Sequence, residues 1–170
     1  MSKAAVQIRP ASPMDSVNIV RLIAEGYRQT PAKELGKLDE QRLLEYVTTM
    51  LRHAFVVVAD QNGRILGTLG VFPVRLPWAS TVVQTETWFA VTEAYRSRRV
   101  PEQLLDAVED MLEKTGQPAL LGTQMLTPQW ANQVIAKRDE YLPSRQTFLR
   151  MPAQFTDAAG KPVVSRKVGT

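Results

Sequence analysis

Three arginines stand close together where the chain is predicted to enter a helix. Arg96, Arg98 and Arg99 precede Pro101, and proline is suited to the first turn of a helix. The free N–H groups and the dipole at a helix start disfavour unpaired cations there and favour a bound anion. The spacing therefore indicates a site for a pyrophosphate, another phosphate or an acidic partner. The alternative is a basic turn whose charges point into solvent.

Glu86 is the second feature whose residue type could carry chemistry. It lies in a stretch of Thr, Val, Trp and Phe, and a charged side chain inside such a strand is uncommon without a partner. The alternative is a strand position that faces outward and forms a surface ion pair. Because threonines flank it on both sides, at Thr85 and Thr87, the sequence leaves the facing of Glu86 open.

Composition argues against several other chemistries. The 170 residues include no cysteine and a single histidine, His53, so any catalytic triad or histidine zinc site would depend on that residue, and we expect no metal site. The formal net charge of +4 is mild, and three tryptophans are spread along the chain, so nucleic acid is not an expected partner. No apolar run approaches the roughly 20 residues of a membrane span. The first residues lack the apolar core of a signal peptide, so we expect a cytoplasmic protein without a membrane partner.

Strands and helices that alternate along the chain must position these groups. Hydrophobic spacing and capping residues predict four helices, over about 12–27, 39–51, 101–116 and 127–137. Runs of β-branched and aromatic residues predict strands over 6–9, 55–58, 65–74, 81–91, 119–125 and 146–151. Asn62 and Gly63 predict a tight turn between the second and third strands. Strands that occur both in hairpins and in β-α-β units argue for a mixed sheet with helices on both faces.

The chain length suits one domain with one well-packed core. We expect that domain to span residues 1–151 and to be followed by a basic C-terminal tail, residues 152–170. The tail carries Lys161, Arg166 and Lys167. It is either flexible or an arm that pairs with a partner, for example by adding a strand to it.

Several stretches resemble the GNAT family of acetyl-CoA-dependent N-acetyltransferases. The resemblance runs over about residues 8–151, and the overall sequence pattern is most similar to that of GNAT-like proteins of tailed phages. In the family's acetyl-CoA motif, a strand leads through the loop pattern Arg/Gln-x-x-Gly-x-Gly/Ala into a helix. The stretches that carry the resemblance are 8–11, 88–91, 95–99, 104–105 and 135–141.

The resemblance implies an α/β fold with a mixed, mostly antiparallel sheet of about six to seven strands flanked by about four helices. It implies acetyl-CoA as cofactor and an amine, on a small molecule or a protein, as acceptor. Glu86 stands where many members place a general base or a base-linked water. Tyr141 could donate a proton to the leaving thiolate, or it could simply pack in the core. By the same resemblance, the cofactor would contact the main chain of Phe89, Ala90 and Val91 and the turn of Arg96, Ser97, Arg98, Arg99 and Val100.

The sequence also departs from the family's motifs. Arg99 stands at the first glycine position, Pro101 at the Gly/Ala position and Ala136 at the position of the usual acid tyrosine, while Glu140 replaces a common glycine. Arg99 adds a Cβ and a cation, and Pro101 removes one N–H donor. These departures leave a second function open. The chain would then be a catalytically inactive GNAT-like structural or interaction protein, including a phage virion component, that joins a protein assembly through the basic loop and the tail.

Overall fold

A computed structural model of the chain describes residues 5–78, 80–122, 127–139 and 141. Short 3-10 turns precede α1, join α1 to α2 and follow β4, at Pro13–Asp15, Pro31–Leu35 and Glu93–Tyr95. Among the described helices, none is long and apolar enough to cross a membrane. The strands and helices are β1 (Gln7–Pro10), α1 (Ser16–Tyr27), α2 (Glu40–His53), β2 (Phe55–Gln61), β3 (Arg64–Arg75), β4 (Val82–Val91), α3 (Val100–Thr115), β5 (Ala119–Leu120) and α4 (Gln129–Ile135).

The strands form one sheet in the order β1-β2-β3-β4-β5. Neighbours from β1 to β4 are antiparallel, and β5 runs parallel to β4. The predicted α/β class with a mixed, mostly antiparallel sheet is therefore confirmed. The described residues supply five strands, fewer than the six to seven expected. The predicted strand over 146–151 and the tail over 152–170 lie outside the described residues.

Strand β5 is shorter than the predicted strand over 119–125. Only Ala119 and Leu120 pair with β4, and residues 123–126 lie outside the described part of the chain. Gly122 has a φ of 73°, in the left-handed region, so the main chain has already left the extended conformation there.

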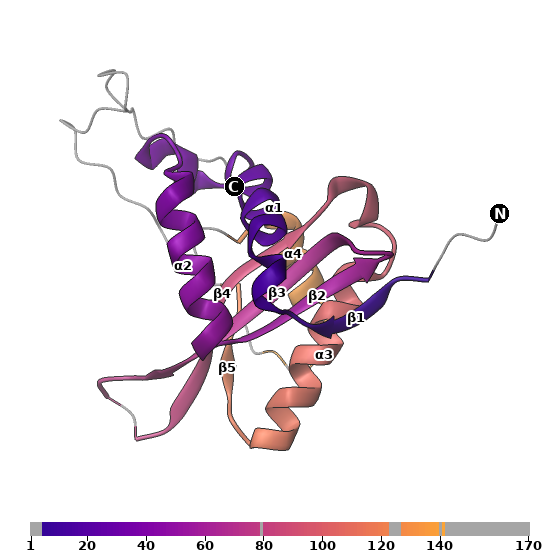
Figure 1. Cartoon of the computed structure of the whole chain (residues 1–170). Coiled ribbons are helices and arrows are strands. Elements are labelled where there is room, and N and C mark those ends of the chain that lie inside the picture. The colour runs from indigo at the N-terminus through magenta and orange to yellow at the C-terminus, as the bar shows by residue number, and fades with distance from the viewer. Residues whose placement is uncertain (1–4, 79, 123–126, 140, 142–170) are drawn as a thin grey trace, which may run out of the picture.

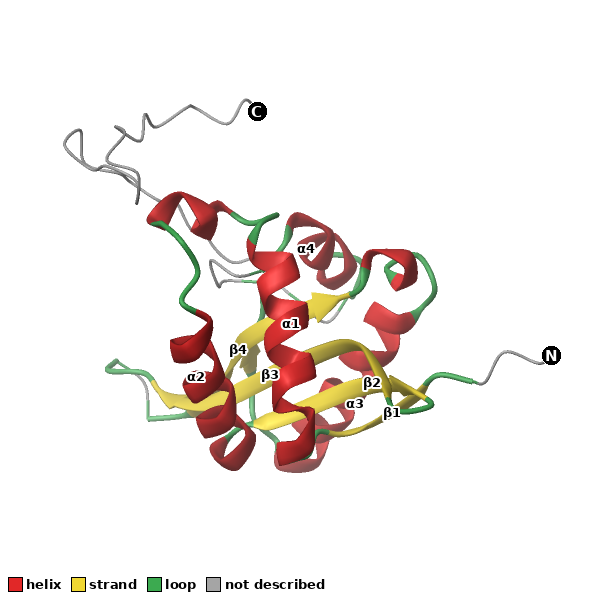
Figure 2. Cartoon of the chain, turned by 45° about the horizontal axis from the view of Figure 1, so that its top comes forward, coloured by secondary structure: helices red, strands yellow, loops and turns green. Residues whose placement is uncertain are grey.

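Helices cover both faces of the sheet, with α1 and α2 on one side and α3 and α4 on the other (Figure 1, Figure 2). Each side encloses its own buried apolar cluster. The cluster under α1 and α2 includes Ile19, Leu22, Ile23, Leu43, Val47, Val56, Val58, Ile65, Trp88 and Ala90. The cluster under α3 and α4 includes Val57, Leu66, Leu69, Val71, Phe89, Val91, Leu104, Leu105, Val108, Ala131, Val134 and Ile135.

Local capping chemistry sets several element ends where the sequence predicted them. The Asp39 carboxylate accepts a hydrogen bond from the Arg42 N–H at 3.0 Å and caps α2. Asn62 and Gly63, with φ of 54° and 80°, turn β2 into β3, and Gly116, with φ of 64°, ends α3. The first helix starts later than expected. Asp15 accepts hydrogen bonds from the N–H and hydroxyl of Ser12, and the α-helix begins only at Ser16.

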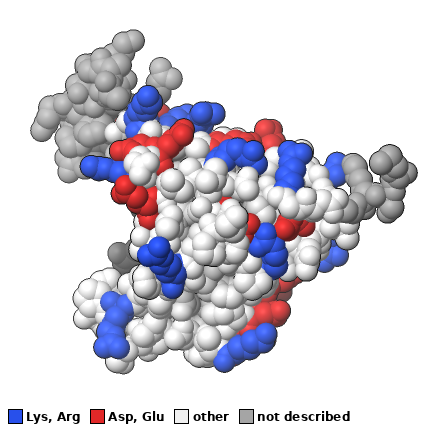
Figure 3. Space-filling view, in the orientation of Figure 1, with Lys and Arg blue, Asp and Glu red and all other residues white. Residues whose placement is uncertain are grey.

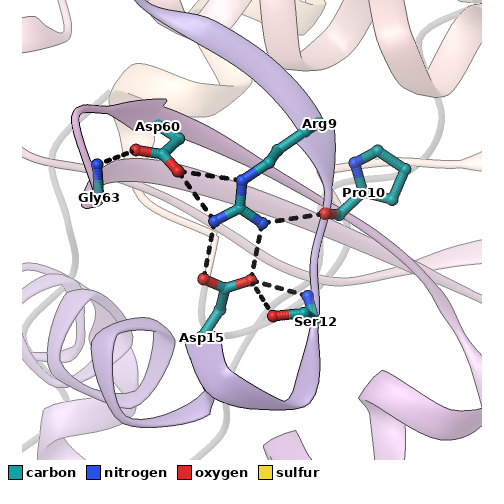
Figure 4. A network of polar contacts seen from close by, with 6 residues as sticks. All are labelled: Arg9, Pro10, Ser12, Asp15, Asp60 and Gly63. Atoms are coloured by element: carbon teal, nitrogen blue, oxygen red, sulfur yellow. Dashed lines mark hydrogen bonds and ion pairs between the residues drawn. The ribbon is translucent and has the colours of Figure 1, made fainter.

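An ion-pair network that the sequence did not suggest ties three elements together (Figure 4). Arg9, on β1, donates to both oxygens of Asp15 at 2.9 Å and, through Nε, to Asp60 on β2 at 3.0 Å. Asp60 also accepts from the Gly63 N–H at 2.7 Å. The network therefore joins the edge strand, the start of α1 and the β2–β3 turn. The hydrogen bonds from Arg9, together with those from Ser12, lower the pKa of Asp15 from 3.8 to about 2.

We predict that Asp15→Asn destabilises the protein at neutral pH. A carboxyl group whose pKa is lower in the folded state stabilises the fold above its unfolded pKa, and that stability is lost as the pH falls toward the folded value. The lowered pKa of Asp15 corresponds to about 2 kcal/mol at pH 7. Urea unfolding of wild type and variant should show this gap at pH 7 and its closure between about pH 4 and pH 2. Asp110→Asn, at an exposed position, should change stability by less than about 0.5 kcal/mol. An equal effect of both substitutions would contradict this role for the network.

Candidate functional site

Strands β4 and β5 form a fork. They pair only at Gln84 with Ala119 and at Thr85 with Leu120. Beyond Thr85, no described strand pairs with the side of β4 that faces away from β3. Within the described part of the chain, main-chain groups of residues 86–90 on that side are therefore open to a further partner.

A β-bulge in β4 sets the direction of the side chains at the vertex of this fork. Gly70 pairs with Trp88 and Val71 pairs with Glu86, so Thr87 is an extra residue in β4. The close approach of the strands requires glycine at position 70, because a Cβ there would lie 2.5 Å from Oγ1 of Thr87. No local sequence pattern predicts the bulge, because it depends on which residue of β3 lies opposite.

Glu86 is buried, with 1% of its surface exposed. One carboxylate oxygen accepts a hydrogen bond from the Thr127 hydroxyl at 2.6 Å, and the other accepts from the Gly122 N–H at 2.8 Å. Burial raises the pKa of the Glu86 carboxyl, and the two hydrogen bonds offset part of that rise. The alternative of an outward-facing residue with a surface ion pair is therefore wrong: the carboxylate is held by neutral donors inside the protein.

The three predicted main-chain contacts lie along the open side of β4. The side chains of Phe89 and Val91 are buried under α3 and α4, and that of Ala90 is buried under α1 and α2. Only their main chain is therefore available to a ligand, which is the group the sequence analysis assigned to the cofactor. That assignment stays a prediction.

Arg96 turns inward from the basic turn. Its Nε donates to the Val91 carbonyl oxygen at 2.9 Å, and its guanidinium lies 5.2 Å from the ring centroid of Trp130. Trp130, on α4, packs edge-on against Phe89 at a centroid distance of 5.2 Å. Arg96 thus fastens the end of β4 to α4, a contact between distant segments that the sequence analysis missed.

The rest of the basic turn faces outward at the start of α3. Ser97, Arg98 and Arg99 are exposed, while Val100 is buried beneath the helix. Arg98 lies over the ring of Tyr95 at 5.2 Å. Arg99 has φ of 60° and ψ of 2°, a left-handed conformation, at the N-cap of α3. This backbone explains the preference for glycine at the corresponding family position, because a Cβ is disfavoured there.

The groups around the fork and the turn suit an anionic cofactor such as acetyl-CoA. The first-turn N–H groups of Val100 and Glu102 have no acceptor within the helix. Arg98 and Arg99 form no ion pair within the described part of the chain. Nε1 of Trp130 is buried and has no hydrogen-bond partner among the residues that the structure describes, so it is a donor that a carbonyl oxygen could satisfy. Among the described residues, no group of three or more metal-ligating side chains is found.

Tyr141 packs, partly buried, against the apolar cluster under α3 and α4. Its N–H donates to the Arg138 carbonyl oxygen at 3.3 Å, in the turn that follows α4. Ala136, directly after α4, is exposed, and Glu140 lies outside the described residues. The role of Tyr141 as an acid stays a prediction.

A separate open cavity of about 520 Å³ lies between α1 and the β2–β3 turn. Arg21 and Glu25 from α1, Arg64 from the start of β3 and Thr92 beyond β4 contribute to its wall. No site residue predicted from the sequence lines it. Figure 3 shows basic and acidic side chains interspersed over the face that carries α1 and α2.

Comparison with known families adds an independent finding. The family model described as an acetyltransferase (GNAT) domain matches residues 7–128, which include every described strand, α1, α2 and α3. No curated protein sequence matches this chain.

Solved structures share the fold at low sequence identity. A possible acetyltransferase from Clostridium difficile 630 is 15% identical, covers 86% of this chain and 97% of its own, and has a TM-score of 0.65. A ribosomal-protein-alanine N-acetyltransferase from Brucella melitensis biovar Abortus 2308 is 17% identical, with 87% and 100% covered and a TM-score of 0.64. A predicted acetyltransferase with acetyl-CoA from Clostridium acetobutylicum is 15% identical, with 83% and 96% covered and a TM-score of 0.63.

We predict that Arg99→Gly stabilises the protein. Glycine adopts the left-handed conformation of this position without a steric penalty, so the free energy of unfolding should rise by about 1 kcal/mol. Removal of a cation from the start of α3 acts in the same direction. Ser97→Gly is the matched change, because position 97 does not have a positive φ, and it should lower stability. Chemical unfolding of both variants measures the difference. Lower stability of Arg99→Gly would contradict the assigned backbone conformation.

A second prediction concerns the buried carboxyl. A raised folded-state pKa means that the folded protein binds the proton more tightly than the unfolded chain, so ionised Glu86 costs stability as pH rises above about 4.5. Glu86→Gln keeps an acceptor for Gly122 and a donor for Thr127 without the charge. Its stability relative to wild type should therefore increase with pH in urea titrations from pH 4 to pH 8. Glu86→Ala should cost about 1–3 kcal/mol, because it leaves both donors unsatisfied. A stability difference between Glu86→Gln and wild type that does not vary with pH would refute the raised pKa.

Proposed function

Because the chain belongs to the GNAT acetyltransferase family, we propose that it binds acetyl-CoA in the fork between β4 and β5 and transfers the acetyl group to an amine. The thioester of the cofactor supplies the activated acetyl group. The observation that carries the proposal is the fork itself. Strands β4 and β5 separate after two paired positions. From the fork, β4 leads through the basic turn to the start of α3.

The main chain of β4 would hold the pantetheine arm. Its open N–H and C=O groups over residues 86–90 can bond amide groups as a neighbouring strand would. Apolar side chains from both clusters fix this strand, because Phe89, Ala90 and Val91 are each at most 5% exposed. Because this strand is already rigid, the protein loses little conformational entropy when a flexible ligand binds along it.

The turn before α3 would hold the pyrophosphate. Arg98 and Arg99 supply the exposed cations, and the first-turn N–H groups of α3 supply donors. Arg96 would act indirectly, because its guanidinium is already bonded to Val91 and stacked on Trp130. It would keep the turn and α4 in place around the cofactor.

Transfer also needs a neutral amine and a protonated leaving group. Each carboxylate oxygen of Glu86 already accepts a hydrogen bond, so its assignment as the base stays a prediction. The assignment of Tyr141 as the acid stays a prediction as well. The amine acceptor on a small molecule or a protein, the resemblance to proteins of tailed phages, the cytoplasmic location and a protein assembly through the basic loop and the tail likewise stay predictions.

The inactive alternative draws on three observations of this chain. Arg96 is engaged internally, Pro101 lacks an N–H and Arg99 carries a Cβ where the backbone is left-handed. A chain that kept the fold without the cofactor would show no acetyl-CoA binding.

Calorimetric titration with acetyl-CoA tests the proposal. We expect saturable binding at one site, weakened by a rise in salt because the turn contacts phosphates through charge. Arg98→Ala and Arg96→Ala should each weaken binding about tenfold, or about 1.4 kcal/mol. Arg52→Ala removes an exposed arginine from α2, on the opposite face of the sheet, and should leave affinity unchanged. Absence of binding by the folded wild-type protein would reject acetyl-CoA as its cofactor and favour the inactive alternative.

A further inference from the structure

The bulge at Thr87 changes the face on which Glu86 lies. Residues directly opposite each other in a ladder share a face of the sheet. Glu86 pairs with Val71, which belongs to the cluster under α3 and α4, whereas Trp88 belongs to the cluster under α1 and α2. In a regular strand, residues 86 and 88 would share a face. The extra residue therefore separates the carboxylate from the α1–α2 side and directs it toward the chain that connects β5 to α4.

Glu86 stands where the strand ladder stops. Thr85 makes the last pair with β5, and the next residue along β4 is Glu86. Its carboxylate bonds the main chain at Gly122, just after β5, and the side chain of Thr127, just before α4. A side chain thus continues the link between β4 and β5 beyond the point where main-chain pairing ends.

Both contact points are themselves confined. Thr127 is 6% exposed, and a Cβ at Gly122 would lie 2.5 Å from Oδ1 of Asn132, on α4. Gly122 also needs its left-handed φ of 73°. The carboxylate therefore fixes two positions that leave little room for movement, one on each side of the segment that separates β5 from α4.

We propose that Glu86 and Thr127 are positioning residues: together they clamp the ends of the β5–α4 connection to β4 and so set the width of the fork that receives the pantetheine arm. This inference rests on the proposed binding of acetyl-CoA. It assigns Glu86 a role other than that of general base. A base must reach the amine, whereas both oxygens of this carboxylate are bonded to the β5–α4 connection.

Cofactor affinity separates the two roles. A general base acts on the amine, so its loss lowers the rate of transfer and leaves acetyl-CoA affinity unchanged. A clamp shapes the cofactor groove, so its loss weakens acetyl-CoA binding before any acceptor is present. In Glu86→Gln, the amide oxygen can accept from the Gly122 N–H and the amide N–H can donate to the Thr127 hydroxyl. In Thr127→Ser, the serine hydroxyl can donate to Glu86 as the threonine hydroxyl does. Those conservative variants should rescue the affinity.

The experiment is calorimetric titration of the full chain with acetyl-CoA at a temperature where every variant is folded by circular dichroism. We expect Thr127→Val and Glu86→Ala to bind at least tenfold more weakly than wild type. Thr127→Ser and Glu86→Gln should bind within about twofold of it. Thr68→Val is the matched control, because Thr68 is a fully buried threonine whose Oγ1 accepts from Trp88 Nε1 at 3.1 Å on the α1–α2 side. It should lower the melting temperature without a change in affinity.

Each outcome decides one point. Wild-type affinity in Thr127→Val and Glu86→Ala would overturn the clamp while leaving acetyl-CoA binding intact. Equal losses in Thr127→Val and Thr68→Val would also overturn it, because general loosening would then account for the effect. No binding by wild type would reject the proposed function and the clamp with it.

Discussion

Strand β4 is buried on both faces, and the rest of the molecule is arranged around this condition. Trp88 fills the side under α1 and α2, where its indole N–H is satisfied by the hydroxyl of Thr68. Phe89 and Val91 fill the side under α3 and α4. Because the strand cannot shift without moving both clusters, its register is fixed, and the bulge at Thr87 becomes a fixed feature as well. The fork, the basic turn and the buried carboxylate all take their positions from this one strand.

The basic turn divides its charges between two tasks. Arg96 faces inward, where the Val91 carbonyl and the Trp130 ring compensate its guanidinium. Arg98 and Arg99 face outward, beside helix N–H groups that are also positive. The inward arginine joins the turn to β4 and α4, while the outward pair adds positive charge to the start of α3, where helix N–H groups already favour an anion. In the proposed site, these cations would offset in part the N–H donor that Pro101 lacks.

Features set by neighbours in sequence could be predicted, and features set by distant contacts could not. Asp39 caps a helix that begins at the next residue, and Asn62 and Gly63 form a turn by their own backbone conformation. The start of α2 and the β2–β3 turn could therefore be predicted from the sequence. Arg9 bonds to Asp60, which is 51 residues away in the sequence, and no local sequence pattern predicts that contact. Glu86 shows the same limit at the site. Its residue type marked it as important, but its facing depends on the bulge, which arises from the register between two strands.

The sequential strand order has a consequence for how this protein is made. Each strand pairs with its neighbour in the chain, and the whole cluster under α1 and α2 is drawn from residues 11–90. The cluster under α3 and α4 needs residues up to Ile135 and beyond. A nascent chain that has emerged from the ribosome up to about residue 91 can thus complete the cluster under α1 and α2. At that stage no helix yet covers the other face of the same sheet. During that interval the nascent protein exposes a broad apolar surface, which is the surface that a chaperone would have to shield until α3 emerges.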